Sequence, residues 1–180
     1  MKNIFVFLIT GFEEIEALAT VDILRRAGLN VKTVSLTESK QVTASHGVTI
    51  VADIMFDEVD LASAELLVLP GGTTNYNEHE GVKAMLKAFA DKGEKVAAIC
   101  ASPMVLGGLG LLKGKNATCY PSFEKYLEGA TLQTEKAVVV DGNITTGRGP
   151  GLTFDFALKL VELVAGKAKR DEVAQGLLLN

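Results

Sequence analysis

The stretch Val96-Ala97-Ala98-Ile99-Cys100-Ala101-Ser102-Pro103 decides the fold of this chain. Its first four residues are an unbroken apolar run, which is typical of a strand covered on both faces. Pro103 suits the first turn of a helix, and Ser102 suits the residue that caps it. Cys100 is therefore predicted to lie on a sharp turn from strand to helix, between small neighbours. This is the arrangement of a nucleophile elbow, with cysteine in place of serine.

Short apolar runs alternate with helical patterns along the rest of the chain. Ile4–Ile9, Val31–Leu36 and Leu66–Leu69 have the composition of buried strands. Apolar residues recur with helical spacing over residues 13–27 and 82–93. This alternation predicts an α/β fold with a doubly wound, mostly parallel sheet sandwiched by helices.

Two segments depart from the simple alternation. Val138–Val140 and Ile144–Thr146 flank Asp141-Gly142, which predicts a β-hairpin with a type I′ turn. Val42–Ile54 carries only short apolar pairs, so we expect short strands at an edge of the sheet. No linker or repeat interrupts the chain, and residues 1–180 are expected to form a single domain.

Composition argues against several classes of protein. The 18 Lys and Arg against 22 Asp and Glu give a net charge of −4, without a basic block that would bind nucleic acid or an anionic membrane. Two cysteines without a Cys-x-x-Cys motif, and two histidines, argue against a disulfide framework or a metal site. The apolar run Ile4–Ile9 is shorter than the ~7–15 residues of a signal-peptide core, and no run approaches the ~20 of a membrane span. We therefore expect a cytoplasmic protein without a metal.

The position of Cys100 also bears on its reactivity. A thiol at a helix N-terminus meets the positive end of the helix dipole, which favours the thiolate. The N–H of Ala101 is expected to point where an oxyanion forms, and the Gly71-Gly72 loop is a source of a second donor. The alternative is that Cys100 packs as a small buried hydrophobic residue, as free cysteines usually do. For Cys119, in a predicted strand over Ala117–Tyr120, that alternative is preferred.

Five motifs, in order along the chain, carry a resemblance to a known family. They are Gly11-Phe12-Glu13-Glu14-Ile15-Glu16, Val21-Asp22 with Arg25-Arg26-Ala27-Gly28, Leu69-Pro70-Gly71-Gly72, Ala98-Ile99-Cys100-Ala101 and Gly147-Arg148-Gly149-Pro150-Gly151. With these motifs the chain resembles the ThiJ/PfpI family of the class I glutamine amidotransferase-like superfamily, most closely its deglycase branch with the bacterial members. The resemblance implies a flavodoxin-like fold with a nucleophile elbow, and a homodimer.

The resemblance assigns catalytic roles to two side chains. The family's nucleophilic cysteine corresponds to Cys100, and its partner carboxyl corresponds to Glu16, which in the family is protonated and donates a hydrogen bond to the thiolate. Burial and an anionic neighbour both disfavour a charged carboxylate, so such a group acts as acid or base near neutral pH. The family's two oxyanion-binding amides correspond to Gly72 and Ala101. Judged from the residues alone, Glu16 would be an ordinary surface member of an acidic first turn.

The chain departs from the family pattern at two positions. Peptidases of the family carry histidine directly after the nucleophile, where this chain has Ala101. A histidine near the pocket of the human member corresponds to Tyr120, which is either a hydrogen-bond donor or a core aromatic residue. His46 corresponds to a position near the dimer interface, and is either an exposed loop residue or part of the partner's pocket. Arg148, between two glycines, either holds an anion in the pocket or braces the loop near Cys100.

The resemblance and the residues together predict a cofactor-independent glyoxalase or deglycase that uses the Cys100 thiolate on a small 2-oxoaldehyde or a glycated protein. Such chemistry requires a thiolate, one acid–base group and an oxyanion pocket, and neither a metal nor an organic cofactor. Two alternatives stay open. The same thiol suits a redox sensor or chaperone that responds to oxidation, and an amide or ester hydrolase is the weaker option because of Ala101. The expected homodimer is placed on Val42–Ile54 and on the helix end at Arg25-Arg26.

Overall fold

A seven-stranded sheet forms the centre of the computed structural model, which describes residues 2–179. Its strands are β1 (Asn3–Leu8), β2 (Asn30–Ser35), β5 (Ile54–Met55), β6 (Ala64–Leu69), β7 (Lys95–Ile99), β10 (Val138–Asp141) and β11 (Ile144–Gly147). Their order is β10-β11-β7-β6-β1-β2-β5, and the pairs are parallel except for β10 with β11. The predicted α/β class with a mostly parallel sheet is confirmed.

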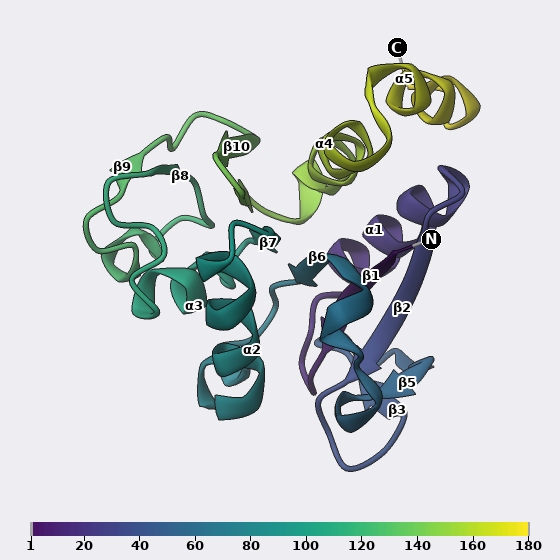
Figure 1. Ribbon diagram of the computed structural model, residues 1–180, viewed down its shortest axis with the longest axis horizontal. Coiled ribbons are helices and arrows are strands. Elements are labelled where there is room, and N and C mark those ends of the chain that lie inside the picture. The colour runs from purple at the N-terminus through teal and green to yellow at the C-terminus, as the bar shows by residue number, and fades with distance from the viewer. Residues whose placement is uncertain (1, 180) are drawn as a thin grey trace.

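Helices cover both faces of this sheet. α1 (Glu14–Arg26) and α4 (Thr153–Ala165) pack together on one face, and α5 (Lys167–Gly176) packs on α4. α2 (Glu80–Asp91) and α3 (Pro103–Gly108) lie on the other face (Figure 1). The connections contain the 3₁₀ helices η1 (Phe56–Glu58), η2 (Leu61–Ser63), η3 (Asn75–Glu78), η4 (Glu124–Tyr126) and η5 (Pro150–Leu152). Within residues 2–179, none of the helices combines the length and the apolar character that crossing a membrane requires.

The central strands are apolar because helices cover both of their faces. In β1, the side chains of Val6, Phe7 and Leu8 have no exposed surface, and Leu67 and Leu69 in β6 are equally buried. Burying a large apolar side chain stabilises a fold by roughly 1.5–3 kcal/mol. The packed core therefore holds the ends of these strands in fixed positions.

Parallel pairing brings the carboxyl ends of β1, β6, β7 and β11 to one edge of the sheet. Gly147 at the end of β11 lies opposite Ile99 at the end of β7, so Arg148 and Cys100 leave neighbouring strands at the same point. On the other side of β7, the end of β6 leads into Pro70-Gly71-Gly72. Open α/β sheets bind their ligands at this edge. Segments distant in sequence thus lie side by side where a site is expected.

The predicted edge segment Val42–Ile54 joins the main sheet only at its end. β3 (Gln41–Thr43) and β4 (Thr49–Val51) pair with each other in a separate two-stranded sheet, and β5 alone pairs with β2. The hairpin leaves the sheet because its backbone finds partners elsewhere. Gly11 N–H donates to Thr43 O at 2.8 Å, which holds the hairpin against the turn before α1.

Two local predictions are wrong for local reasons. The hairpin of β10 and β11 forms, but of its turn residues only Gly142 (φ 62°) has a positive φ, whereas a type I′ turn needs two. The strand predicted around Cys119 ends early, because Thr118 N–H donates to a threonine side chain of β11 instead of continuing a ladder. β8 (Asn116–Ala117) pairs with β9 (Thr131–Leu132), and Cys119 follows in a buried loop.

Candidate active site

Cys100 lies on a strained turn between β7 and α3, as the elbow requires. Its φ of 65° falls in the left-handed region that side chains rarely adopt, at a cost of about 1–3 kcal/mol. Two backbone hydrogen bonds hold it there. Cys100 N–H donates to Gly147 O (3.0 Å), and Tyr120 N–H donates to Cys100 O (2.8 Å). Cys100 is 8% exposed, so its thiol is largely shielded from water.

The residues after Cys100 shape the start of α3 almost as predicted. Pro103 occupies the first turn, and Ser102 is the capping residue. The Ser102 hydroxyl makes no capping hydrogen bond, however, and donates instead to Pro70 O. This bond ties the elbow to the glycine loop that follows β6.

Gly71 and Gly72 approach the thiol closely because they have no side chains. A Cβ on Gly71 would lie 2.6 Å from Cys100 Cβ and 2.7 Å from Glu16 Oε2. A Cβ on Gly72 would lie 2.3 Å from Glu13 N, and the φ of Gly72 is 93°. A side chain at Gly71 would therefore collide with Cys100 and Glu16, and a side chain at Gly72 would collide with the backbone that precedes α1.

The two amides expected to bind an oxyanion meet at the thiol. The backbone N–H groups of Gly72 and Ala101 lie near the Cys100 sulfur and act to lower its pKa. They come from loops after β6 and after β7, which the parallel sheet brings together. Their role as oxyanion donors stays a prediction.

Glu16 lies in the first turn of α1 without any exposed surface. Its Oε2 accepts a hydrogen bond from Gly71 N–H at 2.7 Å. Its Oε1 is buried and has no hydrogen-bond partner of good geometry among residues 2–179. The carboxyl lies beside the Cys100 thiol, close enough for each group to shift the pKa of the other. Glu16 is therefore not the surface residue that its acidic neighbours indicate.

Burial raises the pKa of Glu16 to about 7, and the charge of Glu13 acts in the same direction. The neighbouring Cys100 thiol and the hydrogen bond from Gly71 N–H act to lower the pKa of Glu16 but do not compensate for its burial. The sequence contains no signal that marks Glu13 as part of the site. It is 8% exposed, and its Oε2 accepts the N–H of Glu16 at 2.7 Å. The carboxyl of Glu16 is thus partly neutral near neutral pH, as acid–base catalysis requires.

The pKa of the Cys100 thiol is raised, contrary to the expectation that the helix dipole favours a thiolate. Burial is the largest cause, and the charge and hydrogen bond of Glu16 add to it. Because α3 has only six residues, its dipole is weak against this desolvation. Two acids in such contact titrate as a unit. When Glu16 holds the proton, its repulsion of a thiolate disappears.

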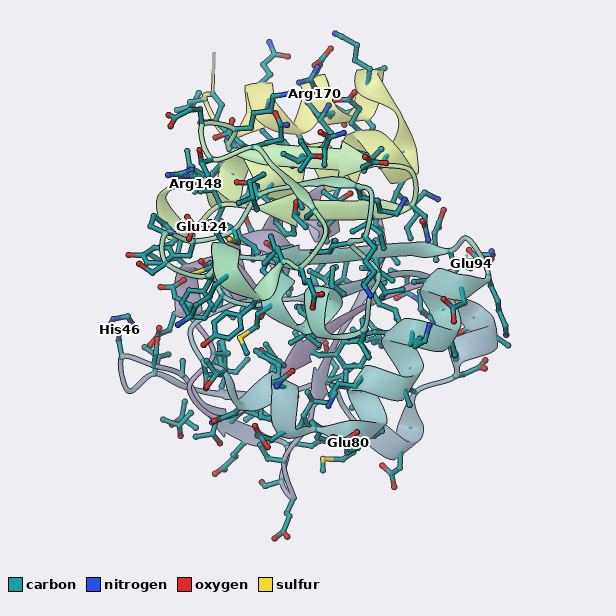
Figure 2. The ribbon with its side chains drawn as sticks, turned by 90° about the vertical axis from the view of Figure 1, so that its left-hand side faces the viewer. His46, Glu80, Glu94, Glu124, Arg148 and Arg170 are labelled. Carbon is teal, nitrogen blue, oxygen red and sulfur yellow. The ribbon has the colours of Figure 1, made fainter. Side chains whose placement is uncertain are left out.

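Both histidines have partners other than the thiol. His46 lies at the tip of the β3–β4 hairpin with 75% of its side chain exposed, and projects from the surface in Figure 2. Its Nδ1 lies 2.8 Å from Glu14 Oε2, and this hydrogen bond raises the pKa of His46. His79 caps α2 by accepting a hydrogen bond from Val82 N–H at 3.0 Å. Within this chain, His46 is an exposed loop residue.

Tyr120 and Arg148 line a cavity of about 330 Å³ beside the elbow. Tyr120 is 44% exposed, so it is not a core aromatic residue. Arg148 Nη1 is buried without a hydrogen-bond partner in the part of the chain that the structure describes. The Arg148 backbone holds the loop instead, through a hydrogen bond from its N–H to Ala137 O (3.0 Å).

Among the described residues, Glu13, Glu14 and His46 form a group of side chains that a metal ion could share. Their ligand atoms lie within 4.8 Å of one another. Two of these groups already have partners, since Glu13 accepts the Glu16 N–H and Glu14 accepts from the backbone and ring of His46. Glu13 thus caps α1, and Glu14 and His46 hold the β3–β4 hairpin against the start of this helix.

These features define an α/β protein with a cysteine at its nucleophile elbow and a buried carboxyl as its partner. The DJ-1/PfpI family model matches residues 2–163, and the chain belongs to this family.

Relatives match along nearly the whole chain. Protein dj-1beta of Drosophila melanogaster is 40% identical over 182 residues, covering 99% of this chain and 97% of the relative. Its crystal structure covers 99% of this chain and 98% of its own, at 39% identity and a TM-score of 0.95. The glutathione-independent glyoxalase DJR-1.2 of Caenorhabditis elegans is 31% identical over 169 residues, covering 93% and 90%. The oxidized DJ-1 of Toxoplasma gondii gives a TM-score of 0.92 at 34% identity, covering 99% of both chains.

Replacing Glu16 with Gln should change how stability depends on pH. The pKa of Glu16 is about 7 in the fold against an ordinary 4.5, so the unfolded chain ionises first as the pH rises. Ionisation of Glu16 therefore lowers the free energy of unfolding of the wild type as the pH rises from 4.5 to 7. Glu16→Gln has no group to ionise at this position, so it does not lose this stability. We expect the unfolding free energy of the variant, relative to wild type, to rise by roughly 2–3 kcal/mol over this window in urea denaturation. A difference that stays flat with pH would contradict the raised pKa.

Proposed function

We propose that this protein is a cofactor-independent glyoxalase in which Cys100 is the nucleophile and Glu16 is the acid–base group. The observation that carries the proposal is the buried Cys100–Glu16 pair with the N–H groups of Gly72 and Ala101 near the sulfur. The proposed substrates are 2-oxoaldehydes such as methylglyoxal, or their adducts with proteins. The printed name of the Caenorhabditis elegans relative, a glutathione-independent glyoxalase, supports this choice of reaction.

The first step is addition to the aldehyde. In the reactive form the pair keeps one proton on Glu16, and Cys100 is the thiolate. Sγ attacks the aldehyde carbon, an S–C bond forms, and the carbonyl π electrons move onto oxygen. The N–H groups of Gly72 and Ala101 donate to that oxygen, and Glu16 gives it a proton. The product is a hemithioacetal.

The second step moves hydrogen between the two carbons. Glu16, now a carboxylate, removes the proton of the former aldehyde carbon and returns it to the neighbouring carbon, while the hydroxyl proton passes to the neighbouring oxygen. The aldehyde carbon is thereby oxidised to a thioester, and the ketone is reduced to an alcohol. Water then cleaves the thioester and releases a 2-hydroxy acid and the thiol. The net change is addition of one water, with no external oxidant or reductant.

Cys100→Ser should abolish conversion of methylglyoxal to lactate, because a serine hydroxyl stays protonated near neutral pH. Glu16→Gln should lower kcat/KM by about 10²–10⁴-fold, which is the usual contribution of a general acid–base group. Lactate is measured without glutathione, and circular dichroism checks that each variant is folded. Cys119→Ser is the matched control and should keep the wild-type rate. Wild-type turnover by Cys100→Ser would overturn the mechanism.

A second candidate function is a response to oxidants through the same sulfur. The favouring observation is again the pair of N–H groups from Gly72 and Ala101, since they would hydrogen-bond to the oxygens of a sulfinate. The Toxoplasma gondii relative, whose solved structure is described as oxidized, is consistent with this chemistry. Such a protein would act as a redox sensor or as a chaperone switched by oxidation. The weaker third option, amide or ester hydrolysis, lacks a histidine next to the nucleophile.

Mild peroxide should convert Cys100 to the sulfinate and leave Cys119 unmodified. Cys100 is 8% exposed and lies near the N–H groups of Gly72 and Ala101, whereas Cys119 is 3% exposed in a buried loop. Peptide mass spectrometry distinguishes the two sites. Stoichiometric sulfinate in a protein that does not convert methylglyoxal would favour the sensor over the enzyme, and oxidation of Cys119 before Cys100 would contradict both functions.

We further propose that the protein acts as a homodimer through the β3–β4 hairpin and the exposed face of α1. Val48 and Val51 on the hairpin are 47% and 68% exposed, and Ile15 on α1 is 53% exposed. Exposed apolar residues grouped in this way mark interaction surfaces. Arg25 near the end of α1 is paired with Asp53 at 2.7 Å, which joins the helix end to this segment.

Val51→Lys should convert the dimer to a monomer, because it places a charge in the proposed contact. Sedimentation velocity measures the change. Val140→Lys is the matched control, since Val140 is 39% exposed on β10 at the opposite end of the sheet. A dimer that survives Val51→Lys but not Val140→Lys would place the interface on the other edge.

A further inference from the structure

The cavity lined by Tyr120 and Arg148 is joined directly to the elbow. It lies between the loop after β8 and the loop after β11, and its walls are Tyr120, Pro121, Arg148, Gly149, Pro150, Gly151 and Leu152. Tyr120 N–H donates to Cys100 O, and Cys100 N–H donates to Gly147 O, the residue before Arg148. Both walls of the cavity are therefore hydrogen-bonded to the residue that carries the thiol. The cavity and the thiol therefore belong to one hydrogen-bonded unit of backbone.

Arg148 stands out in this cavity because its charge has no partner. Within residues 2–179 its guanidinium forms no ion pair, and its Nη1 is buried without a hydrogen bond. Glu124 lies on the same flank in Figure 2, and the two residues act in opposite directions on the pKa of Cys119, but they are not paired. Unpaired, partly buried donors are unfavourable, especially on a charged group. A ligand that supplies acceptor oxygens would offset this cost.

Building on the proposed function, we infer that this cavity binds an oxoanion, a carboxylate or a phosphate, carried at the far end of the carbonyl substrate. Arg148 would hold the oxoanion, because a planar guanidinium matches two of its oxygens at once. The half-exposed Tyr120 would add its hydroxyl, and Pro121, Pro150 and Leu152 would contact the carbon chain between the two ends. The preferred substrate is then an anionic 2-oxoaldehyde rather than methylglyoxal.

Matched substrates test this preference. 4,5-Dioxopentanoate is a 2-oxoaldehyde with a terminal carboxylate, and its methyl ester differs only in lacking that charge. The same addition of water turns the acid into 2-hydroxyglutarate. We expect the wild type to favour the acid over the ester by about tenfold in kcat/KM. A second pair tests a phosphate in the same way: 3-phosphooxy-2-oxopropanal carries the charge, and methylglyoxal lacks it. Each pair gives a ratio of kcat/KM for the anionic over the uncharged substrate, and the pair with the larger ratio shows whether a carboxylate or a phosphate is preferred.

Matched variants assign the preference to Arg148. Arg148→Met should bring the ratio of acid to ester close to one, and Arg148→Lys should leave an intermediate ratio, because lysine keeps the charge but not the two-pronged geometry. Lys125→Met removes a positive charge from η4, outside the residues that line the cavity, and should keep the wild-type ratio. Because each ratio is measured within one variant, a uniform loss of activity cancels. A ratio near one in the wild type in both arms, or a preference that survives Arg148→Met, would overturn the inference.

A binding measurement separates this inference from the proposed reaction. Calorimetry compares 2-hydroxyglutarate with 2-hydroxypentanoate, which lacks the second carboxylate, on wild type and Arg148→Met. Tighter binding of 2-hydroxyglutarate that is lost in Arg148→Met supports the subsite even if no 2-oxoaldehyde is turned over, in which case only the proposed reaction fails. Equal binding of the two hydroxy acids by the wild type counts against the subsite whatever the kinetics show.

Discussion

The site depends on one buried contact, in which the thiol of Cys100 and the carboxyl of Glu16 lie side by side with little water around them. Burial opposes ionisation of each acid, and a charge on one opposes a charge on the other. The pair is therefore driven toward a state with a single negative charge and a single proton. In the proposed mechanism, the position of that proton decides what the site does: on Glu16 it leaves a nucleophile and an acid, and on Cys100 it leaves an inert thiol.

The fold makes this contact by bringing together backbone from distant parts of the chain. α1 supplies Glu16, the loop after β6 supplies the N–H groups of Gly71 and Gly72, and β7 ends at Cys100. The Gly71 N–H holds one carboxyl oxygen, while the Gly72 N–H reaches the sulfur. A parallel sheet fixes this arrangement because its strand ends are buried in a common core and cannot shift independently. The strain at Cys100 persists because hydrogen bonds on both sides of the residue hold its backbone.

The elbow and the sheet could be predicted from the residues themselves, because apolar runs, small neighbours and Pro103 are local signals. Glu16 could not: its acidic neighbours indicate an exposed helix start, and only the family resemblance placed it beside the thiol. The direction of the Cys100 pKa was predicted wrongly, because the helix dipole is visible in sequence whereas burial of the sulfur depends on loops from other strands. The hairpin of β3 and β4 left the sheet for the same kind of reason, since its backbone partners lie in the turn before α1.

The proposed function places one unit of negative charge at the centre of the site, and this charge imposes a condition on the substrates. Glu13, which is almost fully buried beside Glu16, is a further acidic group there, and the chain as a whole has a net charge of −4. An anionic substrate approaching the thiolate would therefore be repelled unless a cation lies within a few ångströms of its path. The parallel register of β7 and β11 places Arg148 directly after Gly147, whose carbonyl accepts the N–H of Cys100. The strand geometry that positions the proposed nucleophile thus also positions the charge to which we assign the selection of substrates.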